Sequence, residues 1–345
     1  MKRLFSPFVI PILLVAIGCK GTNGKTDQTD GCDNGKLLFS SGFEPTCRIV
    51  PLIRIGAKIT PKYKVDHIVG VDKCLPDHAN WDTDMTKYVN GSVFMLEYTG
   101  GTPKQREAKI VEDPMDKNNH VLLFNVKDYW QASEGELKAR VQADFYNMKP
   151  GLKDFYQSVR VYIDPAFKLL EDYPAPIEWL TISEFWNNEW WVKTEIYGFR
   201  ITLGIGKDSN SHQKLHFICN AEDAKRKEVW KAINTKVSVP IGKWFTMEYY
   251  MKEGNRKDGR FWMAITEDNG NRQVVYDVRD WTYNSCDPKP NGITGYNPMK
   301  LYTSKELVSY MKAHGKSLCI FWDDLRLWKD KIPQTESLVS RNSSN

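Results

Sequence analysis

The stretch from Leu137 to Ile163 constrains the fold most, because apolar and polar side chains alternate in it over two successive runs. In the first run Leu137, Ala139, Val141, Ala143 and Phe145 alternate with Lys138, Arg140, Gln142, Asp144 and Tyr146, and in the second run Phe155, Val159, Val161 and Ile163 alternate with Tyr156, Ser158, Arg160 and Tyr162. A period of two is typical of half-buried antiparallel strands. We therefore expect two paired neighbouring strands, Glu136 to Tyr146 and Phe155 to Asp164, joined by a turn at Pro150-Gly151, with Val141 and Val159 in the core.

The polar side of the two runs predicts a binding face. It carries two arginines, a glutamine, an aspartate and three tyrosines. Planar donors, forked guanidinium groups and flat rings together suit sugars that bear hydroxyl and carboxylate groups. The alternative is an ordinary solvated sheet face.

The rest of the chain predicts one all-β domain from residue 36 to 331. Other expected strands are 36–44, 92–98, 108–111, 120–126, 179–185, 190–194, 199–205, 215–219, 244–251, 260–266, 273–276 and 318–328. Many short runs interrupted by turn residues favour a β-sandwich. Two helices are expected, one from a capping box at Thr303 and Glu306 and one over Asp223 to Ile233. The tail 332–345 is predicted to be disordered.

Composition limits the class of partner. The chain has 345 residues and a net charge of only +5, with acids and bases interspersed, which does not indicate a nucleic-acid partner. Twelve tryptophans and sixteen tyrosines favour a β-rich surface that binds carbohydrate. We expect a monomer.

The first nineteen residues predict a targeting segment. Lys2 and Arg3 precede an apolar stretch too short for an ordinary membrane-spanning helix. Residues 16–19 resemble a bacterial lipobox, which implies lipidation of Cys19, a membrane anchor and an outer-membrane lipoprotein of the bacterial cell envelope. Exposure at the cell surface and a plain secretion signal both stay open. Residues 20–35 are expected to form a flexible tether.

The remaining six cysteines have no metal-site spacing. A disulfide among Cys32, Cys47 and Cys74 is expected. Cys219 and Cys319 lie in apolar runs, where a buried thiol and a disulfide are both open.

The order of several segments resembles the concanavalin A-like jelly roll of bacterial polysaccharide lyases and related glucanases, over residues 36–329. These segments are Leu38 to Glu44, Glu136 to Arg140, Tyr156 to Ile163, Pro240 to Trp244 and Phe321 to Trp328. The resemblance implies two curved antiparallel sheets with a glycan groove on the concave face. It also implies cleavage of an acidic, uronic-acid glycan by β-elimination.

Elimination needs a group that neutralises the sugar carboxylate and a group that moves protons. Arg140 and Gln142 stand about 7 Å apart on one strand face, which suits two contacts to one acidic sugar. His216, out of phase with its apolar neighbours, and Tyr162 are the expected proton movers. The candidate catalytic residues are therefore His216, Tyr162 and Arg140, and the substrate-binding candidates are Gln142, Tyr146, Arg160, Glu184, Trp186 and Trp190. The family's histidine after a glutamine or arginine is absent, because residues 182–186 read Ile-Ser-Glu-Phe-Trp.

Two alternatives stay open. Glu184 with a second carboxylate would support glycoside hydrolysis, although the Glu-x-Asp-x-x-Glu motif of jelly-roll glucanases is missing. Trp186 and Trp190 can form a sugar platform, as in a non-catalytic glycan-binding lipoprotein, or a buried plug. We expect no cofactor and no catalytic metal, and leave a structural calcium ion open; Asp323 and Asp324 are expected on opposite faces of the last strand.

Overall fold

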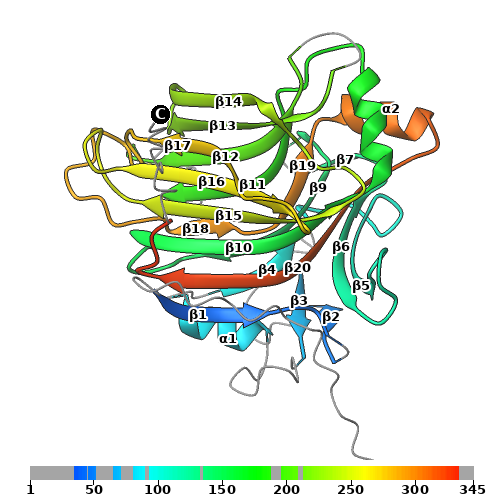
Figure 1. Cartoon of the computed structure of the whole chain (residues 1–345), viewed down its shortest axis with the longest axis horizontal. Helices are drawn as coiled ribbons and strands as arrows, with labels where there is room; N and C mark the ends of the chain where they lie inside the picture. The colour runs from blue at the N-terminus through cyan, green and yellow to red at the C-terminus, as the bar shows by residue number, and fades with distance from the viewer. Residues whose placement is uncertain are drawn as a thin grey trace, which may run out of the picture. The chain divides into compact units, whose positions relative to one another are not determined.

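The computed structural model describes residues 35–44, 46–51, 65–70, 81–89, 93–132, 135–187, 196–208 and 213–333, all within one compact unit that begins at Gly35. They form a sandwich of two large antiparallel sheets (Figure 1). The predicted fold class, an all-β jelly-roll sandwich, is confirmed.

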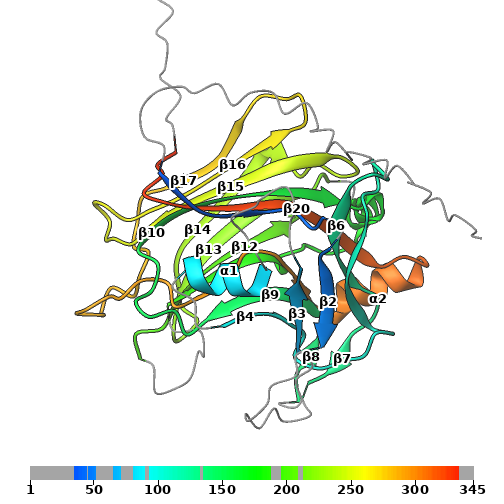
Figure 2. The ribbon, with the colours of Figure 1, turned by 90° about the horizontal axis from the view of Figure 1, so that it is seen from below.

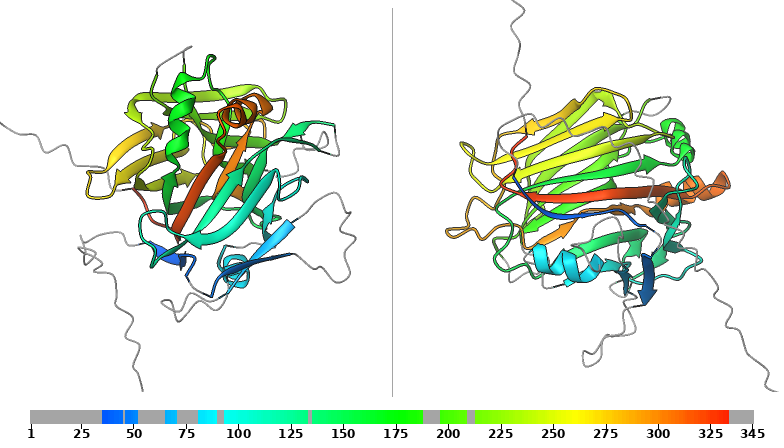
Figure 3. Two further views of the ribbon diagram at one scale, coloured as in Figure 1. Left: turned by 90° about the vertical axis from the view of Figure 1, so that its right-hand side faces the viewer. Right: turned by 60° about the horizontal axis from the view of Figure 1, so that its bottom comes forward.

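The first sheet has eight strands. In spatial order these are β17 (Gln273–Val278), β16 (Arg260–Glu267), β15 (Trp244–Lys252), β10 (Asp154–Ile163), β20 (Leu318–Lys329), β6 (His120–Val126) and β5 (Arg106–Glu112), with β1 (Lys36–Ser41) also paired to β20. The right-hand view of Figure 3 shows β1, in blue, running along β20, in red. The first and last strands of the domain therefore pair with each other.

The second sheet has ten strands. In spatial order these are β14 (Glu228–Ser238), β13 (His216–Asp223), β12 (Phe199–Gly206), β11 (Leu180–Asn187), β18 (Gly295–Asn297), β9 (Arg140–Tyr146), β4 (Val93–Glu97), β3 (Val65–Val69) and β2 (Arg48–Pro51), and β19 (Lys300–Thr303) pairs with both β11 and β9. A small ribbon joins β7 (Trp130–Gln131) to β8 (Leu137–Lys138). The outward side of this second sheet carries the candidate site.

The core lies between the two sheets. Val141 of β9 and Val159 of β10 are both 0% exposed, as the alternation predicts. The helix α1 (Trp81–Tyr88) lies at one edge of the sandwich (Figure 2), where the Trp81 ring stacks on Phe43 and contacts Phe39 edge to face. This helix was not predicted.

The predicted pairing of the two central strands is wrong. β9 pairs with β4, β18 and β19, whereas β10 pairs with β15 and β20 in the other sheet. Because both sheets cover the same core, a period of two selects the buried side chains correctly whichever sheet a strand joins. The polar sides of β9 and β10 consequently lie on opposite surfaces of the protein.

The two predicted helices have different outcomes. The helix predicted after the capping box is α2 (Lys305–Ala313), but its N-cap is Ser304 and not Thr303. A 3-10 helix, η1 (Pro165–Asp172), is also present. The predicted helix over Asp223 to Ile233 is wrong, because this segment turns and continues as β14. Asp223 Oδ1 accepts hydrogen bonds from the backbone nitrogens of Lys225 and Lys227, which closes the turn between β13 and β14. A short polar side chain that captures nearby backbone donors favours a turn over a helix.

The structure tests only part of the predictions made for the cysteines. Cys219 is a buried free thiol and Cys319 a half-buried one. Cys47 is buried, while Cys32 and Cys74 lie outside the described residues. The expected disulfide among these three therefore stays a prediction.

Candidate functional site: a groove on the second sheet

A groove of about 880 Å³ runs over the outward side of the second sheet. Strand order places Arg200 of β12 on one side, Glu184 and Trp186 of β11 in the middle, and Arg140 of β9 on the other side. The strand β19 lies between β11 and β9 and contributes Lys300 and Tyr302 to the groove. Leu301, between them in sequence, is buried in the core, so the side chains of Lys300 and Tyr302 point to the opposite side, toward the groove.

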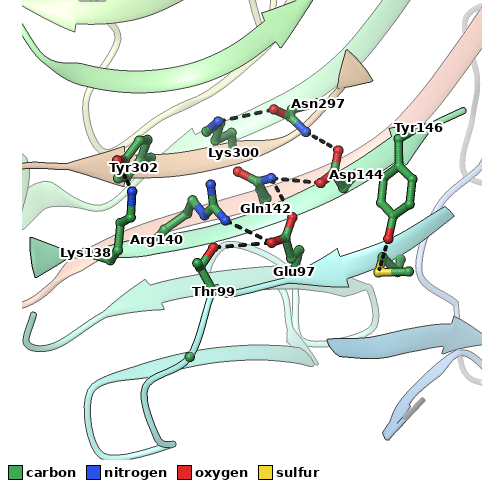
Figure 4. Close-up of polar contacts among 12 residues, drawn as sticks. Glu97, Thr99, Lys138, Arg140, Gln142, Asp144, Tyr146, Asn297, Lys300 and Tyr302 are labelled. Atoms are coloured by element: carbon green, nitrogen blue, oxygen red, sulfur yellow. Dashed lines mark hydrogen bonds and ion pairs between the residues drawn. The ribbon is translucent and has the colours of Figure 1, made fainter. Parts of the chain in front are cut away.

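The side of the groove at β9 is held by a polar network (Figure 4). Arg140 Nη2 lies 3.0 Å from Glu97 Oε1 on the neighbouring strand β4. Gln142 Nε2 donates to Asp144 Oδ2 over 2.9 Å and to Glu97 Oε2 over 3.3 Å. Asn297 Nδ2 donates to Asp144 Oδ1 over 2.7 Å. Asp144 is therefore held by side chains of β9 and β18, and Glu97 by two side chains of β9.

Glu97 and Asp144 differ in protonation. Burial raises the pKa of Asp144, and the charge of Glu97 and a hydrogen bond to it raise that pKa further, to well above the ordinary range. Burial also acts to raise the pKa of Glu97, but the Arg140 charge and the hydrogen bond to Asp144 outweigh it, so this pKa is lowered. The opposite shifts favour a neutral Asp144 beside an ionised Glu97.

Glu184 lies in the middle of the groove floor and is held by two cations. Lys300 Nζ contacts Glu184 Oε2, and Arg200 Nη1 lies 3.7 Å from Glu184 Oε1. Burial opposes ionisation, but the charges of Lys300 and Arg200 dominate and lower the pKa of Glu184. Burial lowers the pKa of Lys300, partly offset by Glu184. Both oxygens of this carboxylate are thus engaged by protein groups.

Tyr302 lines the groove, and its side chain lies near Lys138, Arg140 and Lys300. Its hydroxyl accepts a hydrogen bond from Lys138 Nζ over 3.5 Å. Lys300 Nζ lies 5.2 Å and Arg140 Cζ 5.6 Å from the centre of its ring, and the Trp179 ring meets it edge to face at 4.8 Å. Three cations thus surround this phenol, and each is also paired with a carboxylate, Lys138 with Glu136, Arg140 with Glu97 and Lys300 with Glu184.

Sequence reasoning missed Lys138, Lys300 and Tyr302 as site residues. The signal for β19 is a run of only four residues, Lys300 to Thr303, directly before a helix. Its period of two is too short to stand out from the helix start that follows.

Several predicted residues do lie on the outward side of the second sheet. Arg140, Glu184 and Trp186 line the groove, with Arg200 Cζ 4.9 Å from the Trp186 ring. Gln142 is buried and is not among the described residues that line the groove. Tyr146 lies further along β9, where its hydroxyl lies 3.0 Å from the sulfur of Met95. The predicted Trp190 and Cys19 lie outside the described residues.

Arg160 and Tyr162 do not share this surface, so the predicted single patch of Arg140, Gln142 and Tyr162 is wrong. Both residues belong to β10 in the first sheet. Arg160 pairs with Asp268 at 2.8 Å, and the Tyr162 ring packs against Trp244. Their role in a glycan site on the second sheet is excluded by this placement.

His216 lies on the second sheet but is not among the described residues that line the groove. It is the first residue of β13, is 3% exposed, and places Nε2 3.4 Å from Asp208 Oδ1. A register shift separates it from Phe217. The predicted convergence of His216 with Arg140 in one cleft is therefore not found.

Among the described residues, no group of three or more His, Cys, Asp or Glu side chains is arranged to hold a metal ion. The prediction that Asp323 and Asp324 lie on opposite faces of the last strand is wrong. Both carboxyl groups lie near Gly42, where an added β-carbon would be 3.0 Å from Asp323 Oδ1 and 3.9 Å from Asp324 Oδ1. The positive φ of Asp324, 45°, interrupts the alternation there.

No helix in the described part of the chain is long and apolar enough to cross a membrane.

Comparison with known proteins gives structural similarity at low identity. No family model matches the sequence, and no curated protein matches it. Among solved structures, an endo-β-1,4-glucuronan lyase from the fungus Trichoderma reesei is 12% identical, with a TM-score of 0.40, 69% of this chain covered and 95% of that chain. An alginate lyase from Aplysia kurodai is 10% identical (TM-score 0.39; 64% and 87% covered), and basic winged bean lectin is 8% identical (TM-score 0.35; 68% and 97% covered). Proteins this dissimilar in sequence say nothing about the substrate of this chain.

Proposed function

We propose that the protein is a polysaccharide lyase that cleaves a uronic-acid glycan by β-elimination in the groove of the second sheet. The observation that carries the proposal is Tyr302, a phenol in an open groove, 3.5 Å from Lys138 Nζ and flanked by Arg140 and Lys300. The arrangement combines a group that can move a proton with fixed positive charge for an acidic sugar.

In the elimination, the proton on C5 of the uronate leaves, the C4–O bond breaks, and a C4=C5 double bond forms. Tyr302, as a phenolate supported by Lys138, takes the C5 proton and returns it to the leaving glycosidic oxygen, so the tyrosine ends as it began. Arg140 and Lys138 stabilise the negative charge that spreads onto the substrate carboxylate. Trp179 and Trp186 supply aromatic surface for the sugar rings.

Glycoside hydrolysis through Glu184 is less well supported. A nucleophilic or basic carboxylate needs an oxygen free to meet the sugar or a water molecule. Both Glu184 oxygens are instead held, Oε2 by Lys300 and Oε1 by Arg200 and, at 3.5 Å, by the Thr202 hydroxyl. The contacts assign Glu184 to holding cations in the groove floor.

The proposal is tested with Tyr302→Phe, assayed by the absorbance of unsaturated uronic products over a panel of acidic polysaccharides. We expect wild-type protein to release such products and Tyr302→Phe to lose at least about 100-fold in kcat, since general acid-base groups contribute about that much. Glycan affinity should change little, because the ring that contacts Trp179 is kept. Tyr283→Phe, on a tyrosine outside the groove lining, is the matched control and should keep full activity.

Two results would contradict the proposal. Glycan binding without any unsaturated product would assign a non-catalytic binding protein. New reducing ends without unsaturation, lost in Glu184→Gln, would assign a hydrolase.

We further propose that the protein works at the bacterial cell envelope, anchored by a lipid on Cys19. The lipobox-like sequence at residues 16–19 supports this. Detergent partitioning of the wild type and of Cys19→Ser tests it, and equal partitioning of the two proteins would contradict it.

A further inference from the structure

A second hollow adjoins the groove at its rim. This outer pocket has a volume of about 320 Å³ and is lined by Tyr173, residues 176–179, Ser304 and Leu307. Glu178, Trp179 and Ser304 line both the outer pocket and the groove, so the two hollows are neighbours. Its volume lies at the lower end of the range for small-ligand pockets.

Trp179 stands where the two hollows meet. Trp179 is 42% exposed, so part of its ring is open to a ligand. Its backbone carbonyl accepts a 2.6 Å hydrogen bond from the Thr303 hydroxyl, and its ring packs edge to face on Tyr302. The ring is therefore held in place directly beside the phenol that carries the proposed chemistry.

The two hollows differ in their basic side chains. Six of these line the groove, namely Lys138, Arg140, Arg200, Arg226, Lys300 and Lys305, together with five glutamates, Glu136, Glu178, Glu184, Glu222 and Glu306. No basic side chain is among the described residues that line the outer pocket, where the charged residue is Glu178, which is exposed. Lys207 comes near through its hydrogen bond to the Tyr173 carbonyl, but it is 1% exposed and does not line the pocket.

We propose that the outer pocket is a subsite for an uncharged sugar unit, and that the natural substrate is a mixed glycan in which a uronic acid is followed by a neutral sugar. This rests on the function proposed above. A neutral sugar ring can stack on Trp179 and offer its hydroxyl groups to the Glu178 carboxylate. A second uronate would bring its own carboxylate to Glu178, and no basic side chain among the described residues that line the outer pocket offsets the repulsion.

The test compares two oligosaccharides of equal length, one made only of uronic acid and one that alternates uronic acid with neutral sugar. Wild-type kcat/KM should be higher on the alternating oligosaccharide. Glu178→Gln should raise kcat/KM on the all-uronate oligosaccharide by about fivefold, the size expected for two like charges about 4 Å apart in water, and should change it little on the alternating one. Glu112→Gln, an exposed glutamate on β5 of the first sheet, is the matched control and should change neither value.

The salt dependence of kcat/KM is a second measurement, and a merely structural role of Glu178 would not change it. Repulsion between exposed charges is screened at high ionic strength, so the gain in Glu178→Gln should shrink between 0.01 M and 1 M salt, where the Debye length falls from about 30 Å to about 3 Å. The wild-type preference for the alternating oligosaccharide should weaken over the same range.

Direct binding to Tyr302→Phe separates the two proposals. If the all-uronate oligosaccharide binds as tightly as the alternating one, and Glu178→Gln in that background changes neither affinity, the neutral subsite is wrong even if the enzyme is a lyase. If no oligosaccharide yields unsaturated product but the alternating one binds more tightly and the preference is lost in Glu178→Gln, the lyase proposal is wrong and the neutral subsite is upheld.

Discussion

Asn297 Nδ2 lies 2.7 Å from Asp144 Oδ1, so an amide, rather than a cation, holds this buried carboxyl. Its other oxygen accepts from the amide of Gln142. The charges around it already balance, because the carboxylates of Glu97, Glu184 and Glu222 are matched by the cations Arg140, Arg200 and Lys300. A neutral Asp144 is therefore what keeps the buried network uncharged.

Replacing Asp144 with Asn should change how stability depends on pH. A carboxyl whose native pKa is raised above its unfolded value stabilises the protein fully at pH below the unfolded value and loses that contribution as pH rises toward the native pKa. Wild type should therefore lose stability relative to Asp144→Asn from about pH 4 upward, by at most about 1.4 kcal/mol per pH unit. Urea unfolding of both proteins at pH 5 and pH 7 measures this.

The pKa of Glu97 is lowered, so its contribution to stability increases as pH rises. Because Glu97 is present in both proteins, this contribution largely cancels when their free energies of unfolding are compared. An unfolding free-energy difference that is the same at pH 5 and pH 7 would show that Asp144 is ionised in the native protein.

Replacing Arg140 with Ala should reduce both activity and stability. The guanidinium is a substrate contact in the proposed reaction, and its side chain is only 15% exposed where it pairs with Glu97. Removing it leaves a buried carboxylate without its cation, at a cost of about 3 kcal/mol. Adding Glu97→Gln should restore most of the lost stability but not the activity, as measured by urea unfolding and kcat/KM.

Arg160→Ala is the matched control for Arg140→Ala. Arg160 is also an arginine on a central strand, with an aspartate partner, but on the first sheet. We expect kcat/KM to stay within about twofold of wild type. A large loss in Arg160→Ala would mean that glycan is bound on the first sheet.

The Lys300 and Glu184 pair should behave as a coupled unit. Both residues are almost completely buried, so Lys300→Met or Glu184→Gln alone should cost about 3 to 5 kcal/mol by leaving a charge without its partner. The double variant should cost clearly less than the sum of the two. A double-mutant cycle from urea unfolding measures this coupling, and additive losses would show that the two side chains act independently.

Gln157 is a buried amide on the core side of β10. It is 0% exposed, and neither its Nε2 nor its Oε1 has a hydrogen-bond partner among the described residues. A buried polar group without a partner costs about 1 to 3 kcal/mol. Gln157→Met, which keeps the length of the side chain, should therefore raise the free energy of unfolding by about 1 kcal/mol. A loss of stability would indicate that the amide is hydrogen-bonded through buried water.

Local pattern was enough to predict many elements and the side of each strand that faces the core. The expected strand 120–126 coincides with β6, and the expected strands at 199–205 and 244–251 each differ from β12 and β15 by one residue. Arg140 points outward and Val141 inward, as the period of two requires. This information is local, because a side chain's face depends only on its place in the pleat.

Which strands become neighbours was decided by the tertiary structure. β9 and β10 are consecutive in the chain but belong to opposite sheets, so Arg140 and Arg160 lie on opposite surfaces. The same alternation fits either sheet, since both face one core. Pairing depends on long-range packing, which brings Lys300 and Tyr302 beside Arg140 from some 160 residues away in sequence. The sequence by itself determined the β-sandwich and the inward and outward faces of its strands, and only the tertiary structure decided which outward faces combine into the groove.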